Sequence, residues 1–253
     1  MRPTWLIATA ACLLAACATP MSEPPAPTPD SFAAIVADPA RPQADRDRDS
    51  ARKPAEMLAF AGVRPGETVV DIIPGGGYFT RLFAPAVGPT GKVYAYVPAE
   101  LVGKFSSDAN AKALAAAYPN VEYATDPLKQ PAPAPFADVV FTAQNYHDFH
   151  TALFGAPDVA AVNRAIWTVL KPGGRYVIVD HSAAPGSGTR DANTLHRIDP
   201  DAVRREVEAA GFVFDGSSGV LGNAADPRTA NVFDPSIRGK TDQFALRFRK
   251  PAG

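Results

Sequence analysis

The sequence predicts an α/β fold, a Rossmann-like three-layer sandwich in which helices cover both faces of a mostly parallel sheet. From Thr68 onward, short β-branched or aromatic runs alternate with helical patterns, as parallel βαβ construction requires. The stretch "VVDIIPGGGYFTRLF", Val69 to Phe83, also reads as a buried strand, three glycines and an amphipathic helix. Dinucleotide-binding folds present a ligand site in this way. With 253 residues, the chain is long enough for one such domain with a full core.

The first residues predict a secretory signal and are excluded from the fold. Met1 and Arg2 precede the apolar run "WLIATAACLLAAC", which is too short to span a bilayer. "LAAC", Leu14 to Cys17, resembles the bacterial lipobox, in which the cysteine is lipidated and becomes the mature N-terminus. An ordinary signal peptide with an incidental cysteine is the alternative. We expect a lipoprotein signal peptide over residues 1–17, a lipid anchor on Cys17 and a place on the periplasmic face of the bacterial cell envelope.

Residues 18–43 are expected to form a Pro-rich tether between the membrane and a folded domain over residues 44–253. "ATPMSEPPAPTPDS", Ala18 to Ser31, has the polar, proline-rich composition of an extended segment. Both cysteines, Cys12 and Cys17, precede it, so the folded part has no disulfide and no cysteine nucleophile. A formal net charge of −1 gives no electrostatic reason to expect a nucleic-acid partner.

The expected domain opens on a charged helical segment, Ala44 to Gly62. Met57, Leu58 and Ala61 lie at helical spacing and Gly62 is a good stop, while the charged half is expected to form a solvated helix face or a lid. Seven strands are expected after it: Thr68–Ile73, Lys92–Val97, Val121–Ala124, Ala137–Thr142, Gly173–Asp180, and two near Phe212–Asp215 and Phe244–Arg249.

Two later helices carry start and stop signals. One starts at Asp158 and ends before "KPGG", and the other has Asp199 as N-cap, Pro200 in its first turn and Gly211 as its stop. Their inward faces are Val159, Val162, Ile166, Val169 and Leu170 in the first helix and Val203, Val207 and Ala210 in the second. The connection from Gly216 to Asp242 is long for a compact domain, which is typical of a functional or mobile loop.

The glycine loop, Gly75 to Gly77, brings the backbone close to a ligand and leaves free N–H groups at the start of a helix. A nicotinamide dinucleotide site requires G-x-G-x-x-G, but Thr80 stands at the third glycine. A P-loop requires a lysine after its last glycine, where Tyr78 is found. Both patterns match only in part, and Thr80 weakens the case for a dehydrogenase.

The stretch resembles the first motif of the class I S-adenosylmethionine-dependent methyltransferases, an apolar strand with an acidic residue followed by a glycine-rich loop. Asp71 matches the acidic residue and Gly75 and Gly77 the last two glycines, while Ile73 stands at the usual first glycine. "LKPGGRYVIVDH" resembles the family's fifth strand, and "AAGF" is typical before its sixth. "PGGGYFT", "HRIDP" and "FDPSIRGKTDQF" resemble a subgroup of predicted methyltransferases.

The resemblance implies a seven-stranded sheet with an antiparallel last strand, S-adenosyl-L-methionine as cofactor and methyl transfer to an unidentified, small-molecule acceptor. The residues it implies for the cofactor are Asp71, Gly75, Gly76, Gly77, Asp126 for the adenine amino group, and Asn145. After the second strand, Val97 and Pro98 replace the family's ribose-binding carboxylate, and Glu100 is the nearest substitute. Loss of that hydrogen bond would weaken binding about tenfold or more.

The loop after the fourth expected strand holds the candidate catalytic residues. "FADVVFTAQNYHDF", Phe136 to Phe149, resembles the family's fourth strand and the loop where many members place catalytic or substrate-facing residues. His147 is the candidate general base, with Asp148 or Tyr146 orienting the substrate. The alternative is that His147 caps the next helix or packs.

Other polar residues are expected at the same edge of the sheet. His181, His196 and Arg197 are assigned to the substrate, and Arg197→Ala is expected to weaken binding tenfold or more. No histidine spacing typical of metal ligation on one helix is found, so no metal is expected. Five further basic residues have two interpretations. They form either a positive rim that binds an anionic acceptor or the cofactor carboxylate, or ordinary exposed ion pairs. They are Arg52, Lys53, Arg228, Arg238 and Lys240.

The expected compartment leaves two functions open. S-adenosylmethionine is made in the cytoplasm, so an exported protein would meet it only through leakage or transport. A membrane-tethered binding or scaffold protein that keeps the fold without methyl transfer is therefore the alternative to an enzyme, since fold alone does not establish activity.

Overall fold

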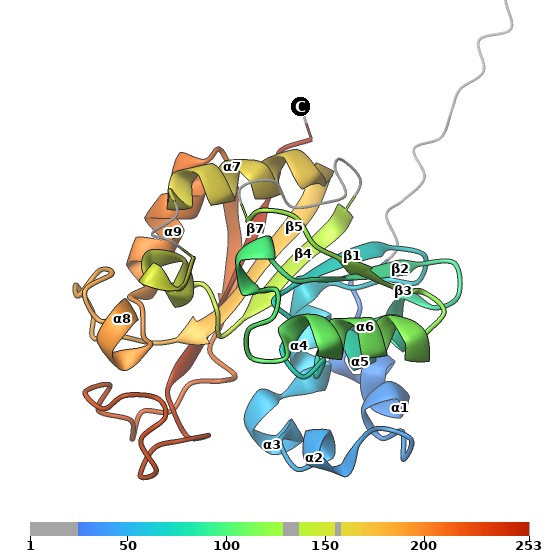
Figure 1. Cartoon of the computed structure of the whole chain (residues 1–253), viewed down its shortest axis with the longest axis horizontal. Coiled ribbons are helices and arrows are strands. Elements are labelled where there is room, and N and C mark those ends of the chain that lie inside the picture. The colour runs from blue at the N-terminus through green and yellow to red at the C-terminus, as the bar shows by residue number, and fades with distance from the viewer. Residues whose placement is uncertain (1–24, 129–136, 155–157, 253) are drawn as a thin grey trace, which may run out of the picture.

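The computed structural model describes residues 25–128, 137–154 and 158–252, which form a seven-stranded sheet with helices on both sides (Figure 1). The strand order is β3-β2-β1-β4-β5-β7-β6, and only β7 runs against its neighbours. This confirms the predicted fold class. The strands are β1 (Thr68–Ile72), β2 (Lys92–Tyr96), β3 (Val121–Ala124), β4 (Ala137–Ala143), β5 (Leu170–His181), β6 (Val213–Ser218) and β7 (Gln243–Arg249).

The strands are apolar because helices cover both faces of the sheet. In β1, Val69, Val70 and Ile72 are all buried, and Val70 pairs with Tyr94 of β2 on one side and Val140 of β4 on the other. β5 begins earlier than the expected Gly173, because Leu170 already pairs with Ala137 across a register shift in β4.

Crossover helices join the parallel strands, a connection that is right-handed as a rule. The chain moves outward from β1 to β2 and β3 through α5 and α6, and in the opposite direction from β4 to β5 through α7. The order therefore reverses between β1 and β4, where open α/β sheets bind ligands. The α-helices are α1 (Ala33–Val36), α2 (Gln43–Arg46), α3 (Asp49–Arg52), α4 (Pro54–Ala61), α5 (Thr80–Val87), α6 (Ser107–Ala117), α7 (Val159–Val169), α8 (Ala192–Leu195) and α9 (Pro200–Ala209).

Four short 3-10 helices complete the elements of the described ranges: η1 (Pro29–Phe32), η2 (Ala99–Leu101), η3 (His147–His150) and η4 (Ala152–Phe154). The predicted caps of α7 and α9 are confirmed. Asp158 accepts a hydrogen bond from the Ala161 amide and Asp199 one from the Asp201 amide. Gly62 adopts the left-handed conformation at the end of α4, as its stop signal predicted.

The folded part begins before the expected boundary at Ala44. Phe32 is buried in the core and Arg41 is also buried, where its guanidinium binds the carboxylate of Asp49. A tether extending to residue 43 is therefore wrong for residues 29–43, which pack onto the domain. The predicted signal peptide over residues 1–17, the lipid site Cys17 and residues 18–24 of the tether lie outside the described residues.

The long connection between β6 and β7 contains no helix or strand, yet two ion pairs hold it in place. Asp226 binds Arg197, and Asp242 binds Arg228. The Val232 amide donates to the carbonyl of Leu195, so the loop lies beside α8 (Figure 1). Among the described residues, no helix is long and apolar enough to cross a membrane.

Candidate functional site

A hollow of about 170 Å³ lies at the switch point between β1 and β4. The loop after β1 lines one wall, the loop after β4 another, and the N-terminal helices a third. Its lining includes four residues predicted for the cofactor, Asp71, Gly75, Gly76 and Asn145. The hollow is smaller than the roughly 300–1,000 Å³ typical of pockets for drug-sized ligands, so it accommodates one part of such a molecule.

The left-handed backbone at Gly77 favours glycine at the turn into α5. Its φ is 82°, and a Cβ there would lie 2.5 Å from the Leu114 side chain. A Cβ on Gly75 or Gly76 would meet nothing within 4 Å, so the space above those two glycines is open. The loop therefore has a packed side and an open side, as a ligand cradle needs.

Ile73 occupies the position of the missing first glycine and still adopts a left-handed backbone, with φ of 58°. A β-branched residue is strained in this region. The Ile73 amide donates to the carbonyl of Tyr96, and its own carbonyl accepts from the Asn145 side chain. These two hydrogen bonds hold Ile73 in the left-handed conformation although the motif's glycine is missing.

Asp71 is buried beneath the loop, and its carboxylate accepts a hydrogen bond of 2.6 Å from the Thr80 hydroxyl. Burial raises the pKa of Asp71 to about 7, against the opposing effects of Thr80 and Arg52. Thr80, which broke the dinucleotide pattern, therefore serves as the hydrogen-bond donor to the acidic residue of the motif.

The charged N-terminal segment is a lid over the glycine loop rather than a solvated face. Tyr78 of the loop donates a 2.6 Å hydrogen bond to Asp49, and the Arg52 guanidinium lies 4.8 Å from the centre of the Tyr78 ring. Arg48 and Arg52 both line the hollow. Burial lowers the pKa of Arg52 to about 10, with a further contribution from Arg48, so Arg52 stays cationic at neutral pH.

The predicted ribose and adenine residues lie away from the lining of the hollow. The carboxylate of Glu100 accepts from the Leu128 amide, at 3.3 and 3.2 Å to its two oxygens. The backbone carbonyl of Asp126 accepts from the Tyr96 hydroxyl at 2.8 Å. Glu100 therefore holds the segment after β3 in place, and the Asp126 side chain remains a prediction.

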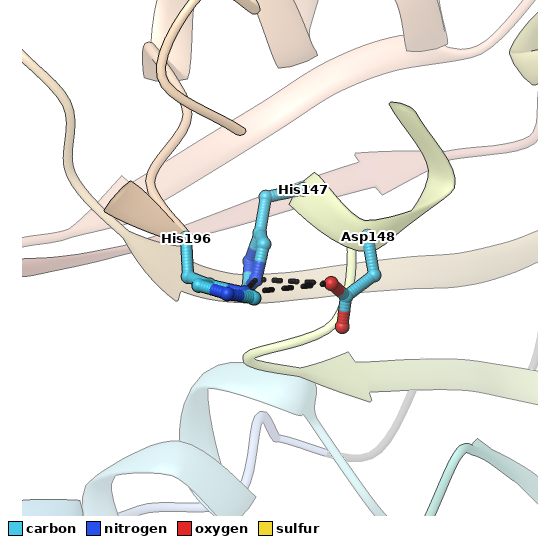
Figure 2. Close-up of side chains that lie close together, drawn as sticks. All are labelled: His147, Asp148 and His196. Carbon is cyan, nitrogen blue, oxygen red and sulfur yellow. Dashed lines mark hydrogen bonds and ion pairs between the residues drawn. The ribbon is translucent and has the colours of Figure 1, made fainter. Parts of the chain in front are cut away.

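Two side chains predicted together for catalysis, His147 and Asp148, meet a third predicted for the substrate, His196 (Figure 2). His147 and Asp148 are consecutive in η3, and His196 follows α8. His147 Nε2 lies 3.2 Å from His196 Nδ1 and 3.4 Å from Asp148 Oδ1, and the last pair of atoms is 3.7 Å apart. We call these three residues the His-Asp-His cluster.

Asp180, at the end of β5, orients His147. One carboxylate oxygen lies 2.8 Å from His147 Nδ1, and the other accepts from the His147 amide, also at 2.8 Å. Burial opposes ionisation of His147, but Asp180 and Asp148 outweigh it and raise its pKa. Burial is the largest effect on the other two residues of the cluster. It raises the pKa of Asp148 and lowers the pKa of His196, and the neighbouring charges have smaller effects on both. No role was predicted for Asp180 from the sequence, although its place at a strand end was a usable signal.

Two predicted site residues lie in the interior instead. Tyr146 is fully buried, donates to Glu206 and accepts from Asn163, so it does not orient a substrate. Arg197 is 0% exposed and holds Asp226 in the long loop, so it is not a substrate residue either. Both corrections have the same cause, since the strand-end position was predicted without knowing which way each side chain points.

His181, also predicted for the substrate, lies near the His-Asp-His cluster but outside it. Its ring is 6.2 Å from that of His147, and its Nδ1 lies 2.8 Å from the Thr241 hydroxyl. Burial lowers the pKa of His181 to about 4, against the opposing effect of Asp180, so its ring is neutral near pH 7.

Comparison with known proteins identifies the family to which this geometry belongs. The sequence model of the ubiE/COQ5 methyltransferase family matches residues 51–197, which run from α3 through β5 to the residue after His196. The chain belongs to the ubiE/COQ5 methyltransferase family. A ubiquinone/menaquinone biosynthesis C-methyltransferase of Ectopseudomonas mendocina is 34% identical over 133 residues, 51% of this chain and 47% of the relative. The chain thus spans about half the length of the curated relatives it matches.

Solved structures agree with the fold of this ubiE/COQ5 family member. An S-adenosylmethionine-dependent methyltransferase from Aquifex aeolicus superposes with a TM-score of 0.58 at 19% identity, over 88% of this chain and 98% of that one. The [4+2]-cyclase SpnF superposes with a TM-score of 0.57 at 15% identity, over 83% of this chain and 82% of that one. The fold is therefore that of S-adenosylmethionine-dependent methyltransferases, and one of its neighbours is named for another reaction.

Proposed function

We propose that the chain binds S-adenosyl-L-methionine at the glycine loop and transfers its methyl group to a small-molecule acceptor. The observation that carries this proposal is the hollow at the switch point, lined by the glycine loop and by Asn145, in a member of a methyltransferase family. The open space above Gly75 and Gly76 supports it further.

The residues present fit one half of this cofactor better than the other. Arg48 and Arg52 line the hollow and suit a carboxylate such as that of the methionine part. The end of β2 offers the buried Val97 in place of a ribose-binding carboxylate, and Glu100 already accepts from Leu128. We expect the methionine part to be held by the loop and lid, and the nucleoside part to be held less tightly than in relatives that keep the acid.

The protein's part in the reaction is mainly one of positioning. When bound, S-adenosylmethionine supplies a methyl group on a positively charged sulfur, and the acceptor must be aligned with it. Asn145 lines the hollow and is two residues before His147 in the chain, which connects the His-Asp-His cluster to the hollow in sequence. The side chains of the cluster are the candidate acceptor-side groups, with His147 as their innermost member.

Calorimetric titration of the protein with S-adenosylmethionine, its demethylated product and NAD tests the proposal. We expect micromolar binding of the first two ligands and none of NAD. Gly76→Val places a branched side chain in the open space above the loop, where a Cβ meets nothing within 4 Å in the empty site, and should weaken binding at least tenfold. Gly219→Val, where a Cβ also meets nothing within 4 Å, is the matched control outside the hollow.

A folded protein that binds none of the three ligands would refute the proposed function. The missing carboxylate after β2 would then explain the loss of cofactor binding. A tethered binding or scaffold protein without catalysis would become the better account. Binding that Gly76→Val and Gly219→Val leave equally unchanged would place the cofactor elsewhere.

We also propose that the protein is a lipoprotein of the bacterial cell envelope, anchored through Cys17. The support is the sequence "LAAC", Leu14 to Cys17, after an apolar run that begins close to Arg2. Radiolabelled palmitate should label the wild-type protein in its native host and leave Cys17→Ser unlabelled. A wild-type protein found unlabelled in the cytosol would contradict the anchor and would remove the problem of cofactor supply.

A further inference from the structure

The His-Asp-His cluster offers three metal-ligand atoms, one from each side chain. These are His147 Nε2, His196 Nδ1 and Asp148 Oδ1, all within 4.8 Å of one another. The sequence could not reveal the set, because Asp148 and His196 are 48 positions apart in the chain and the only short histidine spacing joins His147 to His150. Figure 2 shows the three side chains converging on one point.

The three separations match the edges of a tetrahedron around an ion. Zinc bonds of roughly 2.0–2.1 Å to nitrogen and oxygen give ligand-to-ligand edges of about 3.3 Å in a tetrahedron. Octahedral coordination with the same bond lengths would give about 2.9 Å. The observed separations of 3.2, 3.4 and 3.7 Å lie nearer the tetrahedral value.

Asp180 supplies the second feature of a metal site. A histidine that binds a metal through one ring nitrogen usually donates a hydrogen bond from the other ring N–H to a carboxylate. This hydrogen bond fixes the tautomer and the ring orientation. Asp180 is fully buried, and its oxygen lies 2.8 Å from His147 Nδ1. With the proton held at Nδ1, the Nε2 lone pair of a neutral His147 faces the cluster.

The charges also suit a divalent cation. Asp148 and Asp180 bring two negative charges beside two imidazoles, so an M²⁺ ion would neutralise the group with both rings uncharged. The alternative is a hydrogen bond from one imidazole to the other across the 3.2 Å separation. In that arrangement a protonated His147 would donate from Nε2 toward both His196 Nδ1 and Asp148 Oδ1, so direct measurement of metal binding separates the two accounts.

We infer that His147, Asp148 and His196 bind a divalent transition-metal ion, with zinc as the ion that best fits the geometry. His196 is 30% exposed and Asp148 17%, so a fourth position is open to solvent on that side. Three protein ligands with an open position are typical of a catalytic rather than a structural zinc site. The fourth ligand would be water or an oxygen of the acceptor, whose pKa the ion would lower. Only this acceptor role rests on the proposed function.

Zinc binding by the untagged full-length protein tests the inference directly. Cys12 and Cys17 are replaced by serine in every sample, because thiolates also bind zinc. Equilibrium dialysis against Zn²⁺ should give one bound ion per chain at micromolar free metal. His196→Gln and Asp148→Asn should each weaken binding at least tenfold, and Co²⁺ should give the visible absorption of a tetrahedral site in the parent protein only.

His150→Gln is the matched control, since His150 lies in the same 3-10 helix but pairs with Glu206 outside the cluster. It should bind zinc as tightly as the parent protein. Circular dichroism verifies that each variant is folded. If a ligand variant does not fold, the stoichiometry and Co²⁺ spectrum of the parent protein decide the question alone. A parent protein that binds no stoichiometric zinc, or ligand variants that bind it equally well, would overturn the inference.

The result is separable from that of the proposed function. S-adenosylmethionine binding is measured on the metal-free protein after dialysis against a chelator, and zinc binding is measured without cofactor. Zinc binding without cofactor binding would uphold the metal site and refute methyl transfer. Cofactor binding without zinc binding would refute the metal site and leave the proposed function standing.

Discussion

At the residue scale, the glycine loop shows how one backbone conformation can survive an unfavourable residue. Ile73 keeps φ of 58° at the position where the family resemblance leads one to expect glycine. Such strain costs about 1–3 kcal/mol, and hydrogen bonds to Tyr96 and Asn145 hold the residue in place. The missing glycine could be seen in the sequence. The hydrogen bonds that hold Ile73 in the left-handed conformation could not, because their partners come from β2 and from the loop after β4.

Asp71 predicts a measurable dependence of stability on pH. Its folded-state pKa of about 7 is above the ordinary value, so the folded state binds a proton that the unfolded state has released. The contribution of Asp71 to the free energy of unfolding therefore falls as pH rises from about 4 to about 7. Asp71→Asn should remove that loss and exceed the wild type at pH 8 by up to about 4 kcal/mol in free energy of unfolding.

Urea unfolding of the cofactor-free protein at pH 5 and pH 8 measures the effect. The Asp30→Asn variant makes the same chemical change at an exposed position and is the control. If the advantage of Asp71→Asn is equal at the two pH values, Asp71 does not titrate between them and this prediction fails.

At the element scale, the N-terminal helices are part of the ligand site rather than a leader to it. Tyr78 connects the glycine loop to Asp49 of α3, and Arg41 clamps the same carboxylate from the preceding turn. The charged composition of this segment predicted a solvated face or a lid. Its burial was decided by tertiary partners, because a charge pattern does not specify which opposite charges will meet it.

Phe32 should anchor this N-terminal segment to the domain. It is 4% exposed and lies in the main core, so Phe32→Ala should lower the free energy of unfolding by roughly 3–5 kcal/mol. Phe105→Ala removes the same ring from a site that is 75% exposed and should have a small effect. Chemical denaturation compares the two variants. Equal effects would mean that the segment before Ala44 is a tether, as its composition had suggested.

At the scale of the whole molecule, the sheet edge gathers loops that are distant in the chain. The loops after β1 and β4 form the hollow, and α8 brings His196 to His147. The long final loop reaches the same edge, where Phe233 packs on the His196 ring with centres 4.9 Å apart. The length of this loop predicted a functional segment, and its contact with the cluster agrees with that interpretation.

Arg197 is expected to secure that loop and not a ligand. Its side chain is wholly buried against Asp226, so Arg197→Ala leaves the buried carboxylate with two backbone amide donors but no ion-pair partner and should cost roughly 3–5 kcal/mol of stability. The double variant Arg197→Met with Asp226→Leu should recover much of the loss. Arg238→Ala, at an exposed position of the same loop, is the control. Urea denaturation of the four proteins tests this. An Arg197→Ala protein as stable as the wild type would contradict the structural role of Arg197.

The fold class could be predicted from the sequence because the seven strands and the main helices carry local signals: apolar runs, the Asp158 and Asp199 caps, and the Gly62 stop. The sequence also indicated the glycine loop and the edge where His147 and His196 would lie. Only the tertiary structure decided which side chains face a ligand. Period and capping depend on neighbours in the chain, whereas the burial of Tyr146 and Arg197 and the meeting of Asp148 with His196 depend on contacts between distant segments.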